Sequence, residues 1–269
     1  MSRTFAAKLM SFRGKEDVSG ITIADCFTRI RDRELVAILL DLVPPGERED
    51  WWHDPGFPKT PTNPHNHAPL VIASPTLGPL QRASMDEFPV KLASYFAYAK
   101  VANQSLRKTR FVSLFTSELE ADAYKVGEWG ELLFATKREF MPNHETEFSF
   151  EPHVDAIHFG VDPKMWPIKQ GYEQISALLT IETARNSPGI VMWNRRPSTR
   201  VELNQWITEY RSTGKIAAIE DAERFTVAPG DGQLLIFNSR HLHAVEACWS
   251  HRRTLGTFLV WDDGWKICH

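Results

Sequence analysis

The stretch APGDGQLLIFNSRHLHAVEACWSHRRTLGTFLVW, residues 228–261, decides between a helical and a β-rich protein. A turn signal, Pro-Gly-Asp-Gly at residues 229–232, precedes the apolar run at residues 233–237. Two further runs follow, one entered at His243 and one led by two arginines. Short β-branched or aromatic runs separated by turn residues are typical of antiparallel strands. We therefore predict three consecutive strands in this stretch.

The same pattern of short apolar runs separated by turn residues begins near residue 109 and extends to residue 261. Only residues 200–214 interrupt it with a helical pattern. Together with the strands at residues 232–239 and 253–261, six further strands are predicted at residues 109–118, 131–140, 145–154, 175–183, 189–196 and 224–229.

Helical patterns dominate the part of the chain before residue 109. Residues 32–43 are predicted to form a short buried helix that ends at a Pro-Pro-Gly breaker. Residues 84–108 place apolar side chains at steps of four and three, which is one face of an amphipathic helix. The residues on that face are Phe88, Leu92, Tyr95, Ala99, Ala102 and Leu106.

Helices followed by about eight strands favour a mainly β protein with flanking helices, in which the helices pack on a double-sheet antiparallel roll. We expect a single domain over residues 1–269, with a helical and loop N-terminal embellishment at residues 1–110 and a jelly-roll core at residues 111–262. Residues 44–79 hold nine of the seventeen prolines. This segment is expected to be an irregular loop, and a lid over a cleft is a hypothesis for it.

Composition excludes several classes of partner. The formal net charge of -3 gives no excess of positive charge that would favour binding of nucleic acid. No apolar run is long enough for a membrane helix. Three scattered cysteines are too few for a disulfide framework or a cysteine zinc site, so we expect free thiols. These features predict a soluble cytoplasmic protein that acts on a small molecule.

A candidate metal site begins at EPHVDAIHFG, residues 151–160. His153 and Asp155 are two residues apart, so on a strand they would share one face and could bind one metal ion. A third ligand must come from elsewhere, and His243 is our prediction because the following Ala-Val continues as a strand. His241 is the competing candidate for that position.

In this order, His153, Asp155, His243 and then Arg253 ten residues later, the chain resembles the iron(II)- and 2-oxoglutarate-dependent dioxygenases of the double-stranded β-helix fold. The resemblance covers roughly residues 111–261. It implies Fe(II), 2-oxoglutarate and O2 as cofactor and cosubstrates. It also implies oxidative decarboxylation of 2-oxoglutarate coupled to oxidation of a substrate C–H bond.

Ligand chemistry explains this set of residues. Two imidazoles and one carboxylate on one face of an octahedral iron leave open positions for a chelating 2-oxo acid and dioxygen. Arg253 would form a bidentate pair with the distal carboxylate of 2-oxoglutarate, and Thr257 on the same strand face would add a hydroxyl contact. If the strand register slips by one, Arg252 and Thr254 take these two roles.

Asp155 bears on the outcome of the reaction. Related halogenases have Gly or Ala at this position, so the resemblance implies hydroxylation, or else desaturation or ring formation, of a small polar substrate such as a free amino acid. Three alternatives stay open: an iron oxidase that uses no 2-oxoglutarate, a cupin-type metal isomerase or hydrolase, and a non-catalytic binding module. Whether the arginine points at the metal pocket separates the cupin alternative from the dioxygenase.

Other polar residues have a weaker case. His158 is expected to be a neighbour of the site or a surface residue, and His65 and His67 are expected in a solvated loop. Arg195 or Arg196 could bind a substrate carboxylate, although an exposed loop position is the default for both.

Overall fold

The computed structural model describes residues 3–58, 61–63, 70–72, 86–140, 142, 147–157, 173–183, 189–248 and 250–269. The strands are β1 (Thr4–Ser11), β2 (Gly14–Thr22), β3 (Ala37–Asp41), β4 (Pro61–Asn63), β5 (Leu70–Ile72), β6 (Asp122–Ala123), β7 (Lys125–Val126), β8 (Gly130–Glu131), β9 (Thr136–Phe140), β10 (Phe148–His153), β11 (Gln174–Glu182), β12 (Ile190–Trp193), β13 (Arg224–Val227), β14 (Gln233–Asn238), β15 (His243–Glu246), β16 (Arg252–Trp261) and β17 (Trp265–Ile267). The helices are α1 (Ile23–Arg31), η1 (Pro45–Glu47), α2 (Arg48–Trp52), α4 (Phe88–Leu106), α5 (Arg110–Glu118), α6 (Arg200–Thr213) and η2 (Ala217–Ile219).

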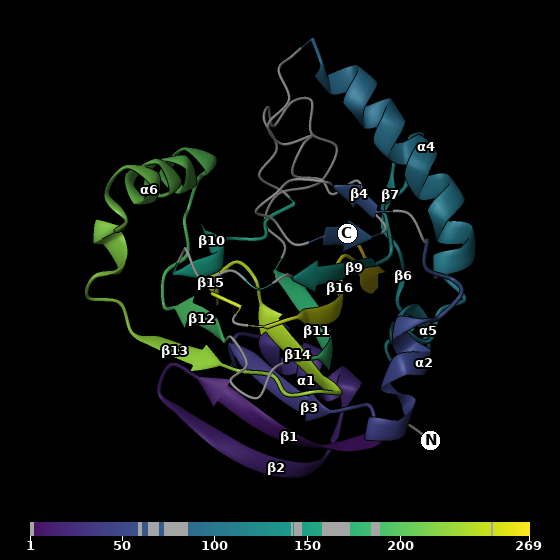
Figure 1. Ribbon diagram of the computed structural model, residues 1–269, viewed down its shortest axis with the longest axis horizontal. Helices are drawn as coiled ribbons and strands as arrows, with labels where there is room; N and C mark the ends of the chain where they lie inside the picture. The colour runs from purple at the N-terminus through teal and green to yellow at the C-terminus, as the bar shows by residue number, and fades with distance from the viewer. Residues whose placement is uncertain are drawn as a thin grey trace.

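Two sheets face each other and form the jelly-roll core (Figure 1). The large sheet has the strand order β2-β1-β3-β14-β11-β16-β9-β5-β4, and β17 pairs with both β16 and β6. The small sheet has the order β10-β15-β12-β13. Buried side chains from both sheets meet between them, among them Met192 of the small sheet and Leu235 of the large one. The predicted fold class, mainly β with flanking helices, is confirmed.

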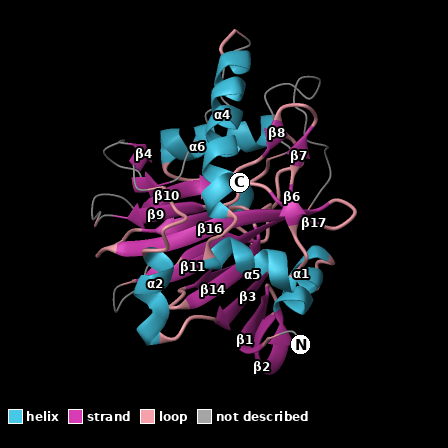
Figure 2. Ribbon diagram, turned by 90° about the vertical axis from the view of Figure 1, so that its right-hand side faces the viewer, coloured by secondary structure: helices cyan, strands magenta, loops and turns pink. Residues whose placement is uncertain are grey.

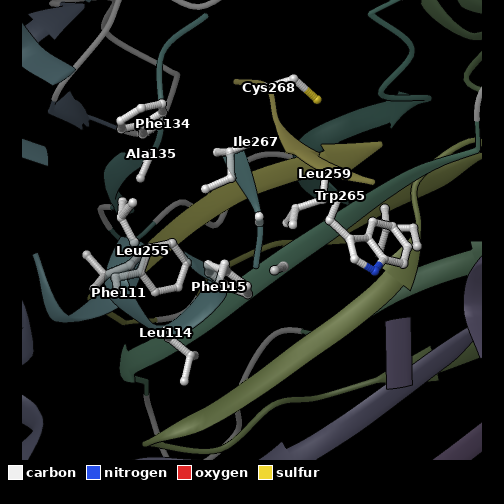
Figure 3. Packing of buried hydrophobic residues seen from close by; sticks show 14 of the residues in the cluster. Phe111, Leu114, Phe115, Phe134, Ala135, Leu255, Leu259, Trp265, Ile267 and Cys268 are labelled. Atoms are coloured by element: carbon white, nitrogen blue, oxygen red, sulfur yellow. The ribbon is translucent and has the colours of Figure 1, made fainter. Parts of the chain in front are cut away.

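Helices cover the outer faces of both sheets. On the large sheet, α1, α4 and α5 contribute to the main apolar cluster (Figure 2), part of which, with Phe115 and Trp265, is shown in Figure 3. In this cluster Phe27 meets Phe115 and Trp265 edge to face. On the small sheet, Trp206 of α6 packs in a cluster with Trp193 of β12. The central strands β11, β14 and β16 of the large sheet are therefore buried on both faces.

The N-terminal segment differs from the prediction, because it extends the large sheet. β1 pairs antiparallel with β2 and with β3, and β3 pairs with β14. The helix predicted at residues 32–43 is therefore wrong. A strand buried on both faces reads as a continuous apolar run, which periodicity alone cannot distinguish from a short buried helix.

The strand predicted at residues 109–118 is also wrong, because the chain forms α5 there. The Thr109 hydroxyl accepts a hydrogen bond from the backbone N–H of Val112 at 3.2 Å and caps the helix. Phe111 and Phe115, one helical turn apart, are both buried and their rings pack edge to face. This spacing of four is the helical signal within the apolar run.

Other local predictions agree with the structure. The predicted helices at residues 84–108 and 200–214 correspond to α4 and α6, and all six residues of the predicted apolar face of α4 are buried. The segment at residues 44–79, expected to be irregular, contains η1, α2, β4 and β5 within its described part. Among the described residues, no helix is both long and apolar enough to cross a membrane.

Candidate metal centre

Two strands of the small sheet bring His153 and His243 together. β10 pairs antiparallel with β15, and in this register His153 lies directly opposite His243. β10 is an edge strand, which tolerates Pro152 because one row of its backbone groups is not needed for pairing. The register shifts on both sides of Phe150, and such bulges re-aim side chains at the end of a strand.

Asp155 reaches the same point from just beyond β10. It lies two residues past the end of the strand, so the expected placement of His153 and Asp155 on one strand face is wrong in detail. Its backbone N–H donates to the carbonyl of Ser239 at 3.0 Å, which ties the loop to the end of β14. Ser176 of β11 donates to the Asp155 carboxylate at 3.4 Å. The carboxylate is therefore held from the large sheet and the two imidazoles from the small one.

The three side chains turn their donor atoms toward one another. His243 Nε2 lies 3.3 Å from Asp155 Oδ2, and His153 Nε2 lies 3.8 Å from Asp155 Oδ1. One ligand atom from each of the three residues lies within 4.8 Å of the others. The structure therefore brings together the three residues that were predicted as metal ligands.

Hydrogen bonds fix the tautomer of both imidazoles. His153 Nδ1 lies 2.7 Å from the carbonyl oxygen of Glu151, and His243 Nδ1 lies 2.8 Å from that of His241. A carbonyl oxygen only accepts, so each Nδ1 carries the proton and each Nε2 presents a lone pair. This is the outer-sphere arrangement found around metal-binding histidines.

Local electrostatics keep His153 and Asp155 in the forms that bind metal. Burial lowers the pKa of His153 to about 3, and the neighbouring His243 adds to this effect. Burial alone would raise the pKa of Asp155, but the neighbouring His243, His153 and Arg138 hold it below its ordinary value. A neutral imidazole and an ionised carboxylate are the ligand forms that a metal ion requires.

His241, the competing candidate, lies outside this cluster. Its Nδ1 lies 3.3 Å from the carbonyl oxygen of Trp193, and its ring packs on Phe12. His158, His65 and His67 lie outside the residues that the structure describes.

A cavity between the two sheets contains the three predicted ligands. Its wall is mostly apolar and includes aromatic rings from both the large and the small sheet. The apolar lining residues include Phe140, Phe150, Ile190, Phe237, Val245 and Phe258. Arg138 of β9 is the cation in this wall, and its side chain has no hydrogen bond or ion pair within the described part of the chain.

Arg253 does not occupy the predicted position. Its guanidinium pairs with Glu49 of α2, and its Nε lies 2.7 Å from Glu182 Oε2. It also stacks over the ring of Trp52 at 5.1 Å. The Thr257 hydroxyl donates to the carbonyl of Phe134 at 2.5 Å and is engaged there. These contacts engage the Arg253 guanidinium outside the cavity and the Thr257 hydroxyl with Phe134, although Thr257 itself lines the cavity. The preferred register was therefore wrong.

Arg252 points the other way. Alternation along β16 puts Arg252 and Thr254 on the same face as Gly256 and Phe258, which line the cavity. Arg252 is 1% exposed, its guanidinium lies 5.6 Å from the ring of Phe140, and no guanidinium nitrogen has a partner among the described residues.

Buried hydroxyl groups accompany this arginine. Thr180 of β11 lies directly opposite Thr254, and neither hydroxyl has a hydrogen-bond partner within the described residues. Burial lowers the pKa of Arg252 to about 10, which still leaves it charged at neutral pH. A buried cation with no counter-ion among the described residues is costly, so an anion bound beside Arg252 would stabilise the fold.

The two other predicted arginines are engaged elsewhere. Arg195 donates to the carbonyl of Ala218 at 2.8 Å, and Arg196 pairs with Glu173 at 2.7 Å. Two cavity residues, Arg138 and His269, were not among the predictions. Lys137 and Arg138 are neighbours on β9, and neighbouring side chains of a strand point to opposite faces of the sheet. One of these two cations therefore had to face the cavity, and this is the feature of the sequence that could have predicted Arg138.

Comparison with solved structures gives a match over the whole chain. An N-substituted L-amino acid dioxygenase from Burkholderia ambifaria AMMD is 39% identical, with a TM-score of 0.87 and coverage of 100% of both chains. The structure of that enzyme in complex with alpha-ketoglutarate, which is 2-oxoglutarate, gives the same identity, score and coverage. Neither a scan against protein-family models nor a search of curated proteins gives a match.

Proposed function

The chain belongs to the iron(II)- and 2-oxoglutarate-dependent dioxygenases, and from this premise we propose that it hydroxylates an N-substituted L-amino acid with an apolar side chain. Members of this family couple oxidative decarboxylation of 2-oxoglutarate to oxidation of a substrate C–H bond. The substrate class is supported by 39% identity over the full length to the dioxygenase described above.

The observation that carries the proposed metal site is the meeting of two imidazole lone pairs with a carboxylate. Nε2 of His153 and Nε2 of His243 both face Asp155 at 3.8 and 3.3 Å, while both Nδ1 atoms donate to carbonyl oxygens. Lone pairs and negative charge at these distances repel unless a cation lies between them. The donor set, two nitrogens and one carboxylate, fits iron(II) of the facial-triad type.

His153, Asp155 and His243 would hold the iron, and Arg252 would bind the distal carboxylate of 2-oxoglutarate. The bound iron supplies the activation of dioxygen. Arg252 contributes a bidentate, charge-assisted pair, and Thr180 and Thr254 offer hydroxyl groups from the two strands beside it.

The cavity wall supports an apolar substrate side chain. Phe150, which is 38% exposed, packs edge to face with His153 at 4.4 Å, and Phe237 packs on His243 at 5.1 Å. These rings keep water away from the ligands and give an alkyl or aromatic side chain an apolar surface. The carboxylate of Asp155 occupies the position that halogenases leave to chloride, which favours hydroxylation.

The test of the metal and cosubstrate is anaerobic reconstitution with iron(II) and 2-oxoglutarate. We expect the visible metal-to-ligand absorption band in the wild-type protein and its loss in His153→Ala and His243→Ala. His241→Ala is the matched control, since this partly buried histidine lies two residues away from His243 and outside the cluster, and it should keep the band. A wild-type protein without the band, or a band that survives His243→Ala, would refute the proposed site.

The test of the substrate is succinate release with a panel of amino acids. N-acetyl-L-leucine and N-acetyl-L-phenylalanine should stimulate succinate release more than the free amino acids do, and mass spectrometry should find a product heavier by one oxygen atom. Equal stimulation by free and N-acetylated amino acids would contradict the substrate class.

We also place the enzyme in the cytoplasm. The three cysteines, Cys26, Cys248 and Cys268, are buried free thiols, which suits a reducing compartment. Cell fractionation with an antibody to the chain tests this location.

A further inference from the structure

The last residue of the chain, His269, is held at the cavity by its backbone. Its N–H donates to the carbonyl of Leu133 at 2.8 Å, and its carbonyl oxygen accepts from the hydroxyl of Tyr95. The preceding Cys268 donates to the carbonyl of Phe258 at 2.9 Å. These backbone hydrogen bonds hold His269 beside β9 and β16 (Figure 1).

The side chain of His269 is buried against an aromatic ring in the wall of the cavity. Its ring stacks on that of Phe258, with centroids 4.7 Å apart and an angle of 7° between the planes. It is 2% exposed, and it lines the same cavity as the predicted iron ligands. Neither ring nitrogen has a partner among the described residues. Burying two unpaired polar atoms costs free energy, so this placement indicates a ligand.

Arg138 complements His269 in the same wall. It lies on β9 opposite Thr254, lines the cavity, and makes no ion-pair contact with the described residues, although the Asp155 carboxylate lies in the same cavity. Burial lowers the pKa of Arg138 while the charge of Asp155 raises it. Burial lowers the pKa of His269 to about 3, with Arg138 adding to the effect, so the imidazole is neutral and keeps one N–H donor.

We propose that Arg138 and His269 together bind one carboxylate beside the iron site, at a position separate from the one that Arg252 provides. Arg138 supplies the charge, and His269 is a positioning residue whose N–H fixes the orientation of the carboxylate. The inference rests on the proposed function. The carboxylate belongs either to the amino acid substrate or to the 2-oxo end of 2-oxoglutarate, and the two sources can be distinguished.

The test compares three variants. His269→Phe keeps the ring and its stacking on Phe258 but removes both nitrogens. His269→Gln keeps a donor, and His241→Phe is the matched control at a partly buried histidine outside the cavity. For each variant, equilibrium dialysis measures the Kd of 2-oxoglutarate on the anaerobic iron-loaded protein without substrate, and succinate release measures kcat and KM for N-acetyl-L-leucine.

We expect His269→Phe to weaken one of the two affinities by about tenfold, the size of one hydrogen bond to a charged group, and His269→Gln to recover most of the loss. A higher KM for N-acetyl-L-leucine with an unchanged Kd for 2-oxoglutarate assigns the carboxylate to the substrate. A higher Kd for 2-oxoglutarate assigns it to the cosubstrate.

Two results would overturn the inference. One is that His269→Phe leaves both affinities within twofold of the wild type. The other is that His269→Phe and His269→Gln lose affinity equally and show the same fall in Tm, which would assign the histidine a structural role. If the wild-type protein itself neither binds 2-oxoglutarate nor releases succinate, the proposed function is wrong. Failure of the inference about His269 shows only in the variants, so the two failures can be distinguished.

Discussion

Replacing Arg252 by Met should abolish the binding of 2-oxoglutarate, whereas Arg253→Met should not. The guanidinium of Arg252 offers two parallel charge-assisted hydrogen bonds, and each is worth about 1.5 to 3 kcal/mol. Loss of about 3 kcal/mol corresponds to a rise in Kd of about 100-fold. Arg253 pairs with Glu49 and Glu182, whose side chains are 60% and 44% exposed, so its removal should change stability by less than about 1 kcal/mol.

The Arg252→Met variant should also differ in the stability of the ligand-free protein. The guanidinium is 1% exposed and has no partner among the described residues. Met fills a similar volume without a buried charge, so the metal-loaded variant without 2-oxoglutarate should melt at the same temperature as the wild type or higher. Weak binding together with an undiminished Tm is a combination that general misfolding cannot produce.

Thermal unfolding with and without 2-oxoglutarate provides the assay, under anaerobic conditions with iron(II) present. At 100 times Kd the cosubstrate should stabilise the wild type by about 2.7 kcal/mol, which is roughly 5 to 10 °C in Tm for a chain of this size. Arg253→Met should keep this shift and Arg252→Met should lose it. The opposite pattern would refute the assignment of Arg252, and a shift that survives in both variants would exclude an arginine anchor on β16.

Two further predictions concern the ligand-free fold. Burial lowers the pKa values of His153, His241 and His269 to about 3 or 4. The unfolded chain therefore takes up protons below about pH 6.5 that the fold does not, and the free energy of unfolding should fall from pH 7 to 5 by up to about 1.4 kcal/mol per pH unit for each histidine. Urea titration of the metal-free protein at several pH values measures this, and a flat profile would contradict it. Gly232→Ala should destabilise the fold by at least about 2 kcal/mol, because φ is +78° and a Cβ would meet a backbone carbonyl oxygen at 2.2 Å. Gly214→Ala, with φ +72° and open space around it, should cost only about 1 kcal/mol, and equal losses would contradict the steric argument.

The order of chemical groups along the chain was enough to predict the metal cluster. His153, Asp155 and His243 are brought together by the pairing of β10 with β15, and that pairing follows from two strands that the apolar pattern already indicated. The choice of His243 over His241 also agrees with the geometry, since His241 turns toward Trp193. Residue types and strand order therefore carried this part of the prediction.

The sequence could not show which side chains of β16 face the cavity and which face the helices. The large sheet is covered by helices on one face and by the small sheet on the other, so Leu255 and Leu259 are as buried as Thr254 and Gly256. Polar and apolar residues consequently do not alternate, and nothing in the pattern shows which arginine points inward. The pairing of β11 with β16 is also irregular between Thr180 and Glu182, next to the arginines.

His269 was beyond prediction for a different reason. Its hydroxyl partner Tyr95 is 174 residues away in the chain, and only the finished fold brings them into contact. Residue types show which groups can form hydrogen bonds, but only the fold shows which of them are left unpaired. Arg252 and His269 are both buried, and no described residue forms a hydrogen bond with the side chain of either. Because burying such groups without partners costs free energy, we propose that each marks a position where a bound carboxylate completes the structure.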